Sequence, residues 1–409
     1  MNNARLHTST NLVLVMLAIV TTVQLAACGG GGGGGAETKT GFGGTGDPNP
    51  PADALTASGP LSAVGVAGIG TTGLDDRASA IFINTQGGQP FSALKLGMVA
   101  EVTGTIPANS TSVMAGTATN ILVESAVVGP VSAVDLANQR IIVFPLTVQI
   151  DQNTIFEGVN SLANLRTGGR VEVYGLAQPE SRSVLATRLI SPPAVAAAPI
   201  ELLGNATNVS AFQFTLQGVA VSTASIAGVT TPTGNLSGTT SIVENTRVRV
   251  LGTYTATGNS IVPSQIITGI PVTRNDNTIT VLDGVVQSIS SNGRIRLNDT
   301  DVETTAANAA AVSVGSRLQV KGRKTAGIVV ATDFRPIAAG ERIQYVVQGE
   351  IANFVSAANF TIRGETINAS TATFVGGAAT NLANGRTVRV KVQVIVGQLE
   401  ASEVSFVGS

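Results

Sequence analysis

Apolar and polar residues alternate in one eight-residue stretch that recurs five times along the chain. The copy at residues 168–175 reads Gly-Gly-Arg-Val-Glu-Val-Tyr-Gly, and in every copy the positions four and two residues before the last are apolar. These pairs are Ala100 and Val102, Val171 and Val173, Val248 and Val250, Leu318 and Val320, and Val388 and Val390. A period of two is typical of a half-buried strand. Each copy is therefore predicted to be a strand, named here the key strand, with the apolar pair facing a core.

Each key strand lies inside a longer repeat. A repeat opens with Gly-x-apolar, as at Gly129-Pro130-Val131, and closes with a small, a hydroxyl, a polar and an apolar residue, as at Ala186-Thr187-Arg188-Leu189. Successive openings lie a small domain's length apart, which is longer than the units of solenoid proteins. The predicted modules, called repeats one to five, are residues 57–125, 126–191, 200–269, 279–338 and 343–409.

The strand pattern within a repeat indicates an all-β fold. Five short strands, with a connector between the third and the fourth, are typical of a small closed barrel of the OB type. Closure removes the exposed edges that make Val-rich strands prone to aggregate. The alternative is a small open β-sandwich. Composition agrees with either fold. The chain has 47 Gly, no Trp and only 12% charged residues, and its Val, Ile and Thr favour strands.

The N-terminus has the features of an export signal. Residues 1–27 combine Arg5 with an apolar run that is short for a membrane span, and they end in Leu-Ala-Ala before Cys28. This ending resembles the lipobox of bacterial lipoproteins, in which the cysteine is acylated and becomes the new N-terminus. The alternative is an ordinary cleaved signal with an incidental cysteine. Gly29, in place of the Asp that retains such proteins at the inner membrane, favours the outer membrane. Residues 28–56, rich in Gly and Pro, are predicted to be a flexible tether.

Two residue counts restrict the chemistry. The sequence contains one histidine, His7, and one cysteine, Cys28, and both lie in the N-terminal segment. A mature chain without imidazole or free thiol lacks the usual residues of nucleophilic triads and zinc sites. We therefore expect no catalytic residues, no metal site, no cofactor and no enzyme activity; a carboxylate-based hydrolase is the residual alternative. Carboxylates gather at Asp75-Asp76 and at Asp299, Asp301 and Glu303, where turn formation is the simpler explanation.

Charge defines the expected partners. A formal net charge of −1 argues against nucleic-acid binding. In repeats three to five the outward positions of the key strands carry only cations among their charged residues: Arg247, Arg249, Arg317, Lys321, Arg389 and Lys391. One interpretation is that these charges keep Val-rich strands soluble. The other is that they contact an anionic partner, such as an acidic envelope protein or an anionic envelope polymer.

The Gly-x-apolar opening, the Gly-x-x-Val-x-Val-x-Gly strand and the closing Ala-Thr-x-Ile together resemble bacterial repeat lipoproteins of domain-of-unknown-function family 5666. The resemblance covers roughly residues 57–407 and implies no catalytic residue. The expected function is that of a lipid-anchored cell-envelope protein, attached to the membrane through Cys28 and facing the periplasm or the cell surface. Such a protein would be a non-enzymatic binding or scaffold protein. The alternative is a ligand-binding lipoprotein for an anionic envelope polymer or a cation.

Overall fold

The computed structural model describes residues 53–64, 67–69, 81–85, 94–106, 114–179, 182–191, 199–223, 229–231, 234–236, 242–268 and 276–407. These residues belong to one compact unit, formed by residues 51–86 and 91–409. Strands make up most of the described residues, and their α-helix, α1 (Ala306–Ala310), has five residues. The predicted all-β fold class is confirmed. The predicted signal, Cys28 and the Asp75-Asp76 pair lie outside the described residues.

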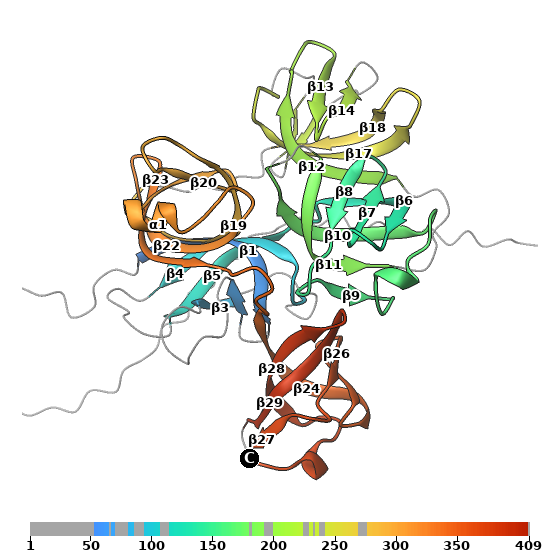
Figure 1. Ribbon diagram of the computed structural model, residues 1–409, viewed down its shortest axis with the longest axis vertical. Coiled ribbons are helices and arrows are strands. Elements are labelled where there is room, and N and C mark those ends of the chain that lie inside the picture. The colour runs from blue at the N-terminus through green and yellow to red at the C-terminus, as the bar shows by residue number, and fades with distance from the viewer. Residues whose placement is uncertain are drawn as a thin grey trace, which may run out of the picture. The chain divides into compact units, whose positions relative to one another are not determined.

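The strands follow the sequence repeats (Figure 1). Repeat one contains β1 (Asp53–Val64), β2 (Ala67–Ile69), β3 (Ile81–Thr85), β4 (Val99–Ile106) and β5 (Met114–Val123). Repeat two contains β6 (Val127–Asp135), β7 (Arg140–Val143), β8 (Leu146–Gln149), β9 (Ile155–Glu157), the 3-10 helix η2 (Leu162–Asn164), β10 (Arg170–Ala177) and β11 (Ser183–Ile190). Repeat three contains β12 (Ile200–Thr207), β13 (Gln213–Leu216), β14 (Val219–Ser222), β15 (Val229–Thr231), β16 (Gly234–Leu236), β17 (Arg247–Thr255) and β18 (Ser260–Ile267).

Repeats four and five continue the same order. Repeat four contains β19 (Ile279–Ile289), β20 (Ile295–Leu297), β21 (Thr300–Glu303), α1, β22 (Arg317–Thr325) and β23 (Ile328–Pro336). Repeat five contains β24 (Gln344–Ser356), β25 (Asn359–Ile362), β26 (Glu365–Asn368), β27 (Thr373–Val375), the 3-10 helix η4 (Ala379–Asn381), β28 (Thr387–Ile395) and β29 (Gln398–Phe406). The key strands are thus β4, β10, β17, β22 and β28.

The strands of a repeat close into a barrel. In repeat two, β6 pairs with β7, β7 with β8, β8 in parallel with β11, β11 with β10, and β10 again with β6. This order, first-second-third-fifth-fourth-first, is that of the OB type. The same circuit recurs in repeat three through β12, β13, β14, β18 and β17, and in repeat five through β24, β25, β26, β29 and β28. Closed barrels are therefore confirmed over open sandwiches.

Strands of different repeats also pair with one another. β6 pairs with β12 in an antiparallel register, and β1 pairs in parallel with both β19 and β24. The circuits are thereby linked into one 16-stranded and one 13-stranded sheet. Buried side chains cross the repeats as well: repeats two and three share one apolar cluster, and repeats one and five share most of another. Because the circuits are joined in this way, the count of five independent modules stays a prediction.

The start of β1 corrects one predicted boundary. The tether was predicted to extend to residue 56, but β1 begins at Asp53. Residues 53–56 pair with β4, and Leu55 and Thr56 also pair with β19. Leu55 is only 2% exposed. Because all four residues pair with β4, and two of them also pair with β19, they belong to a barrel strand rather than to a flexible segment.

The predicted register of the key strands is confirmed. All ten residues of the apolar pairs, from Ala100 to Val390, are at most 2% exposed. In repeat two the intervening Glu172 is only half-buried, on the opposite face of β10 from Val171 and Val173. A shift by one residue would exchange these faces. Burial of the valines therefore fixes the register of this strand.

The first residue of the key-strand motif needs a left-handed backbone. Gly97, Gly168, Gly315 and Gly385 have φ between 76° and 88°, and Asn245 in repeat three has φ 65°. Asparagine tolerates this region better than most residues other than glycine. The one repeat that lacks the glycine therefore keeps the conformation.

A β-bulge explains the closing motif. In every repeat the pairing of the fourth and fifth strands shifts where the key-strand motif ends, as between Tyr174 and Gly175 in repeat two. The extra residue is always a small hydroxyl residue: Thr119, Thr187, Ser264, Thr332 and Ser402. In repeats two to five its hydroxyl donates to the key-strand carbonyl one residue before the shift, at 3.1–3.3 Å. The hydroxyl thus donates a hydrogen bond to a carbonyl that the bulge removes from the pairing of the two strands.

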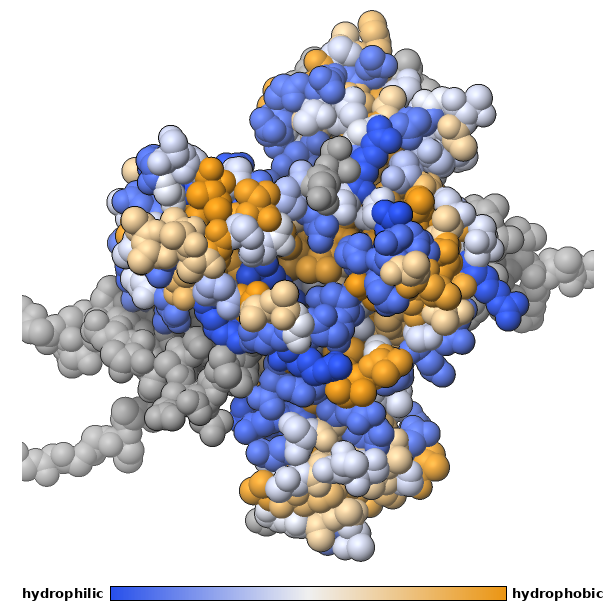
Figure 2. Space-filling model, viewed as in Figure 1, coloured by the Kyte–Doolittle hydropathy of each residue, from blue (hydrophilic) through white to orange (hydrophobic). Residues whose placement is uncertain are grey.

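Exposed apolar residues are scattered. Phe212, Val355 and Val396 are 70–76% exposed and come from different hairpins and connections. On the face drawn in Figure 2, apolar side chains form small separate areas among polar ones. Isolated exposed apolar residues are ordinary on soluble proteins. These residues therefore do not mark a binding surface on this face.

Candidate functional site

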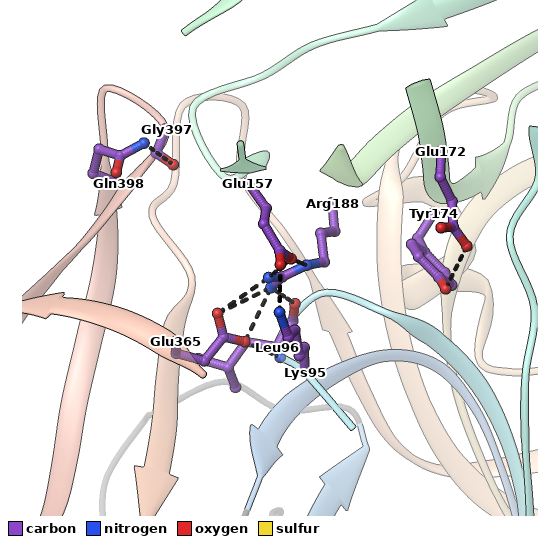
Figure 3. Close-up of polar contacts among 9 residues, drawn as sticks. All are labelled: Lys95, Leu96, Glu157, Glu172, Tyr174, Arg188, Glu365, Gly397 and Gln398. Atoms are coloured by element: carbon purple, nitrogen blue, oxygen red, sulfur yellow. Dashed lines mark hydrogen bonds and ion pairs between the residues drawn. The ribbon is translucent and has the colours of Figure 1, made fainter. Parts of the chain in front are cut away.

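Three repeats meet at one buried arginine. Arg188 lies on β11 next to the bulge residue Thr187, and its side chain is 1% exposed. It points toward Glu157 at the end of β9, Glu365 at the start of β26, and Lys95-Leu96 before β4 (Figure 3). We call these five residues the joint. They come from repeats one, two and five, so the joint links segments that are far apart in the sequence.

All five guanidinium N–H groups of Arg188 have acceptors. Nη1 donates to the Leu96 carbonyl at 2.9 Å and to Glu365 Oε1 at 3.0 Å. Nη2 donates to Glu365 Oε2 at 3.2 Å and to Glu157, and Nε donates to Glu157 Oε2 at 3.2 Å. The fork of a guanidinium suits such two-pronged contacts with carboxylates. Arg188 is therefore satisfied only when all three repeats are in place.

The two carboxylates of the joint are in different surroundings. Glu365 is 97% buried as a side chain, and burial raises its pKa, against the opposing effects of Arg188 and of the Leu96 N–H, which donates to Oε1 at 2.8 Å. Glu157 is 32% exposed. Burial acts to raise its pKa too, but the hydrogen bonds from Lys95 and Arg188 outweigh burial and hold its pKa below the usual value. Two cations and two anions meet here, so the joint is electrically neutral.

Local backbone structure places Arg188. The bulge makes Thr187 the extra residue, and Arg188 then pairs with Tyr174 on β10. Thr187 is also buried, and its single hydroxyl proton is shared between the Tyr174 carbonyl at 3.1 Å and the Gly97 carbonyl of repeat one at 2.6 Å. Bulges commonly re-aim side chains in this way. Two successive residues of β11 thus contact another repeat, which regular alternation would not allow.

Two of the predicted cations, Arg247 and Arg249, face a carboxylate of the same chain. Arg247 donates to Glu124 Oε2 at 2.6 and 3.0 Å, and the Arg249 guanidinium lies 3.7 Å from Glu124 Oε1. Glu124 lies at the end of repeat one, and its side chain is 2% exposed. The structure therefore brings Arg247 and Arg249 together, at a contact between repeats.

Arg317 departs from its predicted exposure. It is 8% exposed and donates to both oxygens of Asp283 at 2.8 and 3.0 Å. Burial acts to lower its pKa, but Asp283 outweighs burial and raises it. The expectation that Arg317 faces solvent is wrong, because β19 supplies a buried carboxylate opposite it.

The remaining cations are half-buried. Burial lowers the pKa of Lys321, which lies on β22. Lys391 donates to Glu403 at 3.3 Å, and Arg389 lies on the same strand, β28. The six predicted contacts thus do not form one continuous group, since Arg247 and Arg249 face Glu124 while Arg317 faces Asp283.

The predicted carboxylate group of repeat four forms ion pairs. Asp301 accepts from Arg296 at 3.0 Å across the β20–β21 hairpin, and Glu303 lies 3.7 Å from Arg294. Asp299 accepts from the Asn205 amide at 2.9 Å. Within the described ranges, no group of three or more His, Cys, Asp or Glu side chains is arranged to hold a metal ion.

Sequence reasoning missed the joint. Arg188 occupies the polar position of the closing motif, where the other repeats have Asn120, Gln265, Asp333 and Glu403. The arginine in repeat two was the available signal, but a polar residue on an outer face is ordinary. Its partners Glu157 and Glu365 stand at strand ends of two different repeats, and sequence spacing does not show that they meet.

Comparisons with known proteins support the family resemblance. The model of a family described as Domain of unknown function (DUF5666) matches residues 128–189 and 348–405, which lie in repeats two and five. The resemblance noted from the sequence motifs is thereby confirmed for these two regions of the chain. No curated protein matches the chain. Among the helices of the described segments, none has the length and apolar character needed to span a membrane.

Proposed function

We propose that this chain is a non-enzymatic scaffold protein of the cell envelope, whose barrels are held in one fixed arrangement to carry binding surfaces. The observation that carries the proposal is the joint. One guanidinium, 1% exposed, satisfies its donors with groups from three repeats. A buried ion pair with complete hydrogen bonding requires one geometry, whereas any displacement leaves a buried charge without its partner.

Pairing between repeats supports the same proposal. β1 pairs with strands of repeats four and five, and β6 pairs with β12 of repeat three. Backbone hydrogen bonds of this kind leave little freedom for one barrel to rotate against the next. Barrels at set spacings can hold several partners at once, which is what a scaffold does.

The proposed location, at the outer membrane, depends on the N-terminal segment. Cys28 after Leu-Ala-Ala supports lipid attachment, and Gly29 supports the outer membrane. Replacing Cys28 by Ser should move the protein from the membrane fraction to the soluble fraction, because several acyl chains anchor stably and none would remain. A variant that stays in the membrane fraction after a high-salt wash would contradict lipid anchoring.

The alternative, a ligand-binding lipoprotein for an anionic envelope polymer or a cation, draws less support from the geometry. Arg247, Arg249 and Arg317 face the buried carboxylates of Glu124 and Asp283 rather than an outside partner. A protein partner of the envelope is therefore the proposed one, and no role with nucleic acid is proposed for a chain of net charge −1.

Double electron–electron resonance tests the fixed arrangement. The chain has one cysteine, so a Cys28→Ser background allows spin labels at Leu136→Cys in repeat two and Val355→Cys in repeat five, both more than half exposed. We expect a single narrow distribution of distances between the labels. The same pair in an Arg188→Met background should give a broad distribution. A broad distribution in the parent protein would refute the scaffold proposal.

A further inference from the structure

A cavity of about 320 Å³ lies beside the joint. It is lined by β9 and the loop after it in repeat two, and by the β25–β26 and β28–β29 hairpins of repeat five. Its polar lining includes Glu157, Arg188, Glu365, Asn160, Thr366 and Gln398. The volume falls at the lower end of the range of ~300–1,000 Å³ typical of small-molecule sites. The cavity therefore has room for one small ligand.

The charged groups of this cavity are already used. Every N–H of Arg188 donates within the joint, and both oxygens of Glu365 accept from Arg188 or Leu96. The two oxygens of Glu157 accept from Lys95 and Arg188. An anionic or cationic ligand would have to break these pairs and would leave a buried charge without its partner. The lining thus disfavours a charged ligand.

The neutral groups of the cavity are open. Within the part of the chain that the structure describes, the Asn160 amide and the Thr366 hydroxyl make no hydrogen bond, and both residues are exposed. Gln398 donates through Nε2 to the carbonyls of Asn160 and Gly397, at 3.4 and 3.2 Å, which leaves its Oε1 available. Amides and a hydroxyl offer both donors and acceptors. Half-buried Val159 adds apolar surface to the same lining.

From these observations we propose that the cavity binds a neutral polyhydroxylated ligand, a sugar ring. Hydroxyl groups of the ring exchange hydrogen bonds with Asn160, Thr366 and Gln398, and its C–H face lies against Val159. The hydrogen bonds and ion pairs of the joint stay intact when the sugar is bound. This inference goes beyond the scaffold proposal by assigning a ligand class to one surface. It rests on the joint being formed.

Titration followed by saturation-transfer NMR tests the proposal. The full chain is kept in a detergent without a sugar headgroup and titrated with glucose, N-acetylglucosamine and the disaccharide of the latter. Glucuronate and glucosamine serve as the anionic and cationic analogues. We expect saturable binding of at least one neutral sugar and no tighter binding of its charged analogues. Tighter binding of the disaccharide would indicate a glycan as the source of the ring, and equal binding would indicate a free sugar.

A matched pair of variants completes the test. Asn160→Ala with Gln398→Ala should weaken binding by about tenfold or more, since two hydrogen bonds are lost. Gln213→Ala with Asn292→Ala, two exposed amides of other repeats, should leave binding unchanged. Absence of saturable binding, undiminished binding by the first variant, or tenfold preference for a charged analogue would overturn the proposal. In each of these cases, a narrow distribution of distances between the two spin labels in the parent protein would still support the scaffold proposal.

Discussion

Removing the guanidinium of Arg188 is the sharpest test of the joint. Arg188→Met keeps much of the stem and removes every donor, which leaves the 97% buried Glu365 carboxylate with the Leu96 N–H as its remaining hydrogen-bond donor. Breaking a buried ion pair by removing one member costs about 3–5 kcal/mol, because an uncompensated charge remains. Glu157 adds little to this cost, since it keeps Lys95 and is 32% exposed.

Hydrogen exchange measures this loss locally, without assuming that the whole chain unfolds in one step. Two backbone amides report on the joint: Leu96 N–H, which donates to Glu365, and Phe156 N–H, which donates to the Gly397 carbonyl of repeat five at 3.0 Å. A change of 3–5 kcal/mol in the free energy of opening corresponds to roughly two to three and a half powers of ten in exchange rate. The Val286 amide, bonded within repeat four, should keep its protection.

Two controls decide what the result means. Arg188→Met combined with Glu365→Met replaces the pair by apolar groups, and it should restore most of the protection of Phe156, because no buried charge is left. Arg188→Lys keeps the charge but loses the fork, so an intermediate loss is expected. A loss of less than tenfold at Leu96 and Phe156 in Arg188→Met would refute the reasoning. An equal loss at Val286 would show general unfolding instead of opening of the joint.

Three further predictions concern register, glycines and acid. Val173→Asp should unfold repeat two, because an unpaired charge would enter a fully buried position. Glu172→Lys, on the other face of β10, should change the free energy of unfolding by about 0.5 kcal/mol or less. The opposite order of the two variants in urea unfolding would contradict the register. Gly168→Asn should leave the stability nearly unchanged, because Asn245 holds the same backbone conformation in repeat three. Gly175→Ala should lower the stability by about 1–3 kcal/mol, because its Cβ would lie 2.5 Å from the Leu185 carbonyl oxygen. Equal melting temperatures of the two variants would refute this contrast. The pKa of Glu157 is lowered on folding, so Glu157 stabilises the folded state above pH 4.5, the ordinary pKa of this carboxyl, and this stabilisation is lost as pH falls through the folded-state pKa. The pKa of Glu365 is raised on folding, so Glu365 acts in the opposite direction. Protection at Phe156, corrected for intrinsic exchange, should therefore fall on acidification below about pH 4.5 more in the parent protein than in Glu157→Gln, and identical pH profiles would contradict this role of Glu157.

Local sequence pattern determined the strands and their closure into barrels. Alternation in the key strands predicted which face is buried, because side chains of a strand point to opposite faces with a period of two. The left-handed Gly or Asn at the start of the motif and the bulge at the closing hydroxyl residue were not predicted, but both recur at fixed positions of the motif. Each of these features depends on neighbours within one repeat, so the sequence carries them directly.

Tertiary structure alone decided how the repeats are joined and which polar residues are buried. Arg188 and Arg317 stand at positions where alternation predicts a solvated face, and both are buried by carboxylates from elsewhere, Arg317 by Asp283 and Arg188 by Glu157 and Glu365. Residues 53–56 look like the end of a tether until β4 and β19 pair with them. The physical reason is the same in each case. Periodicity reports the face that turns away from a strand's own barrel, whereas contact with another strand or another repeat decides whether that face meets water.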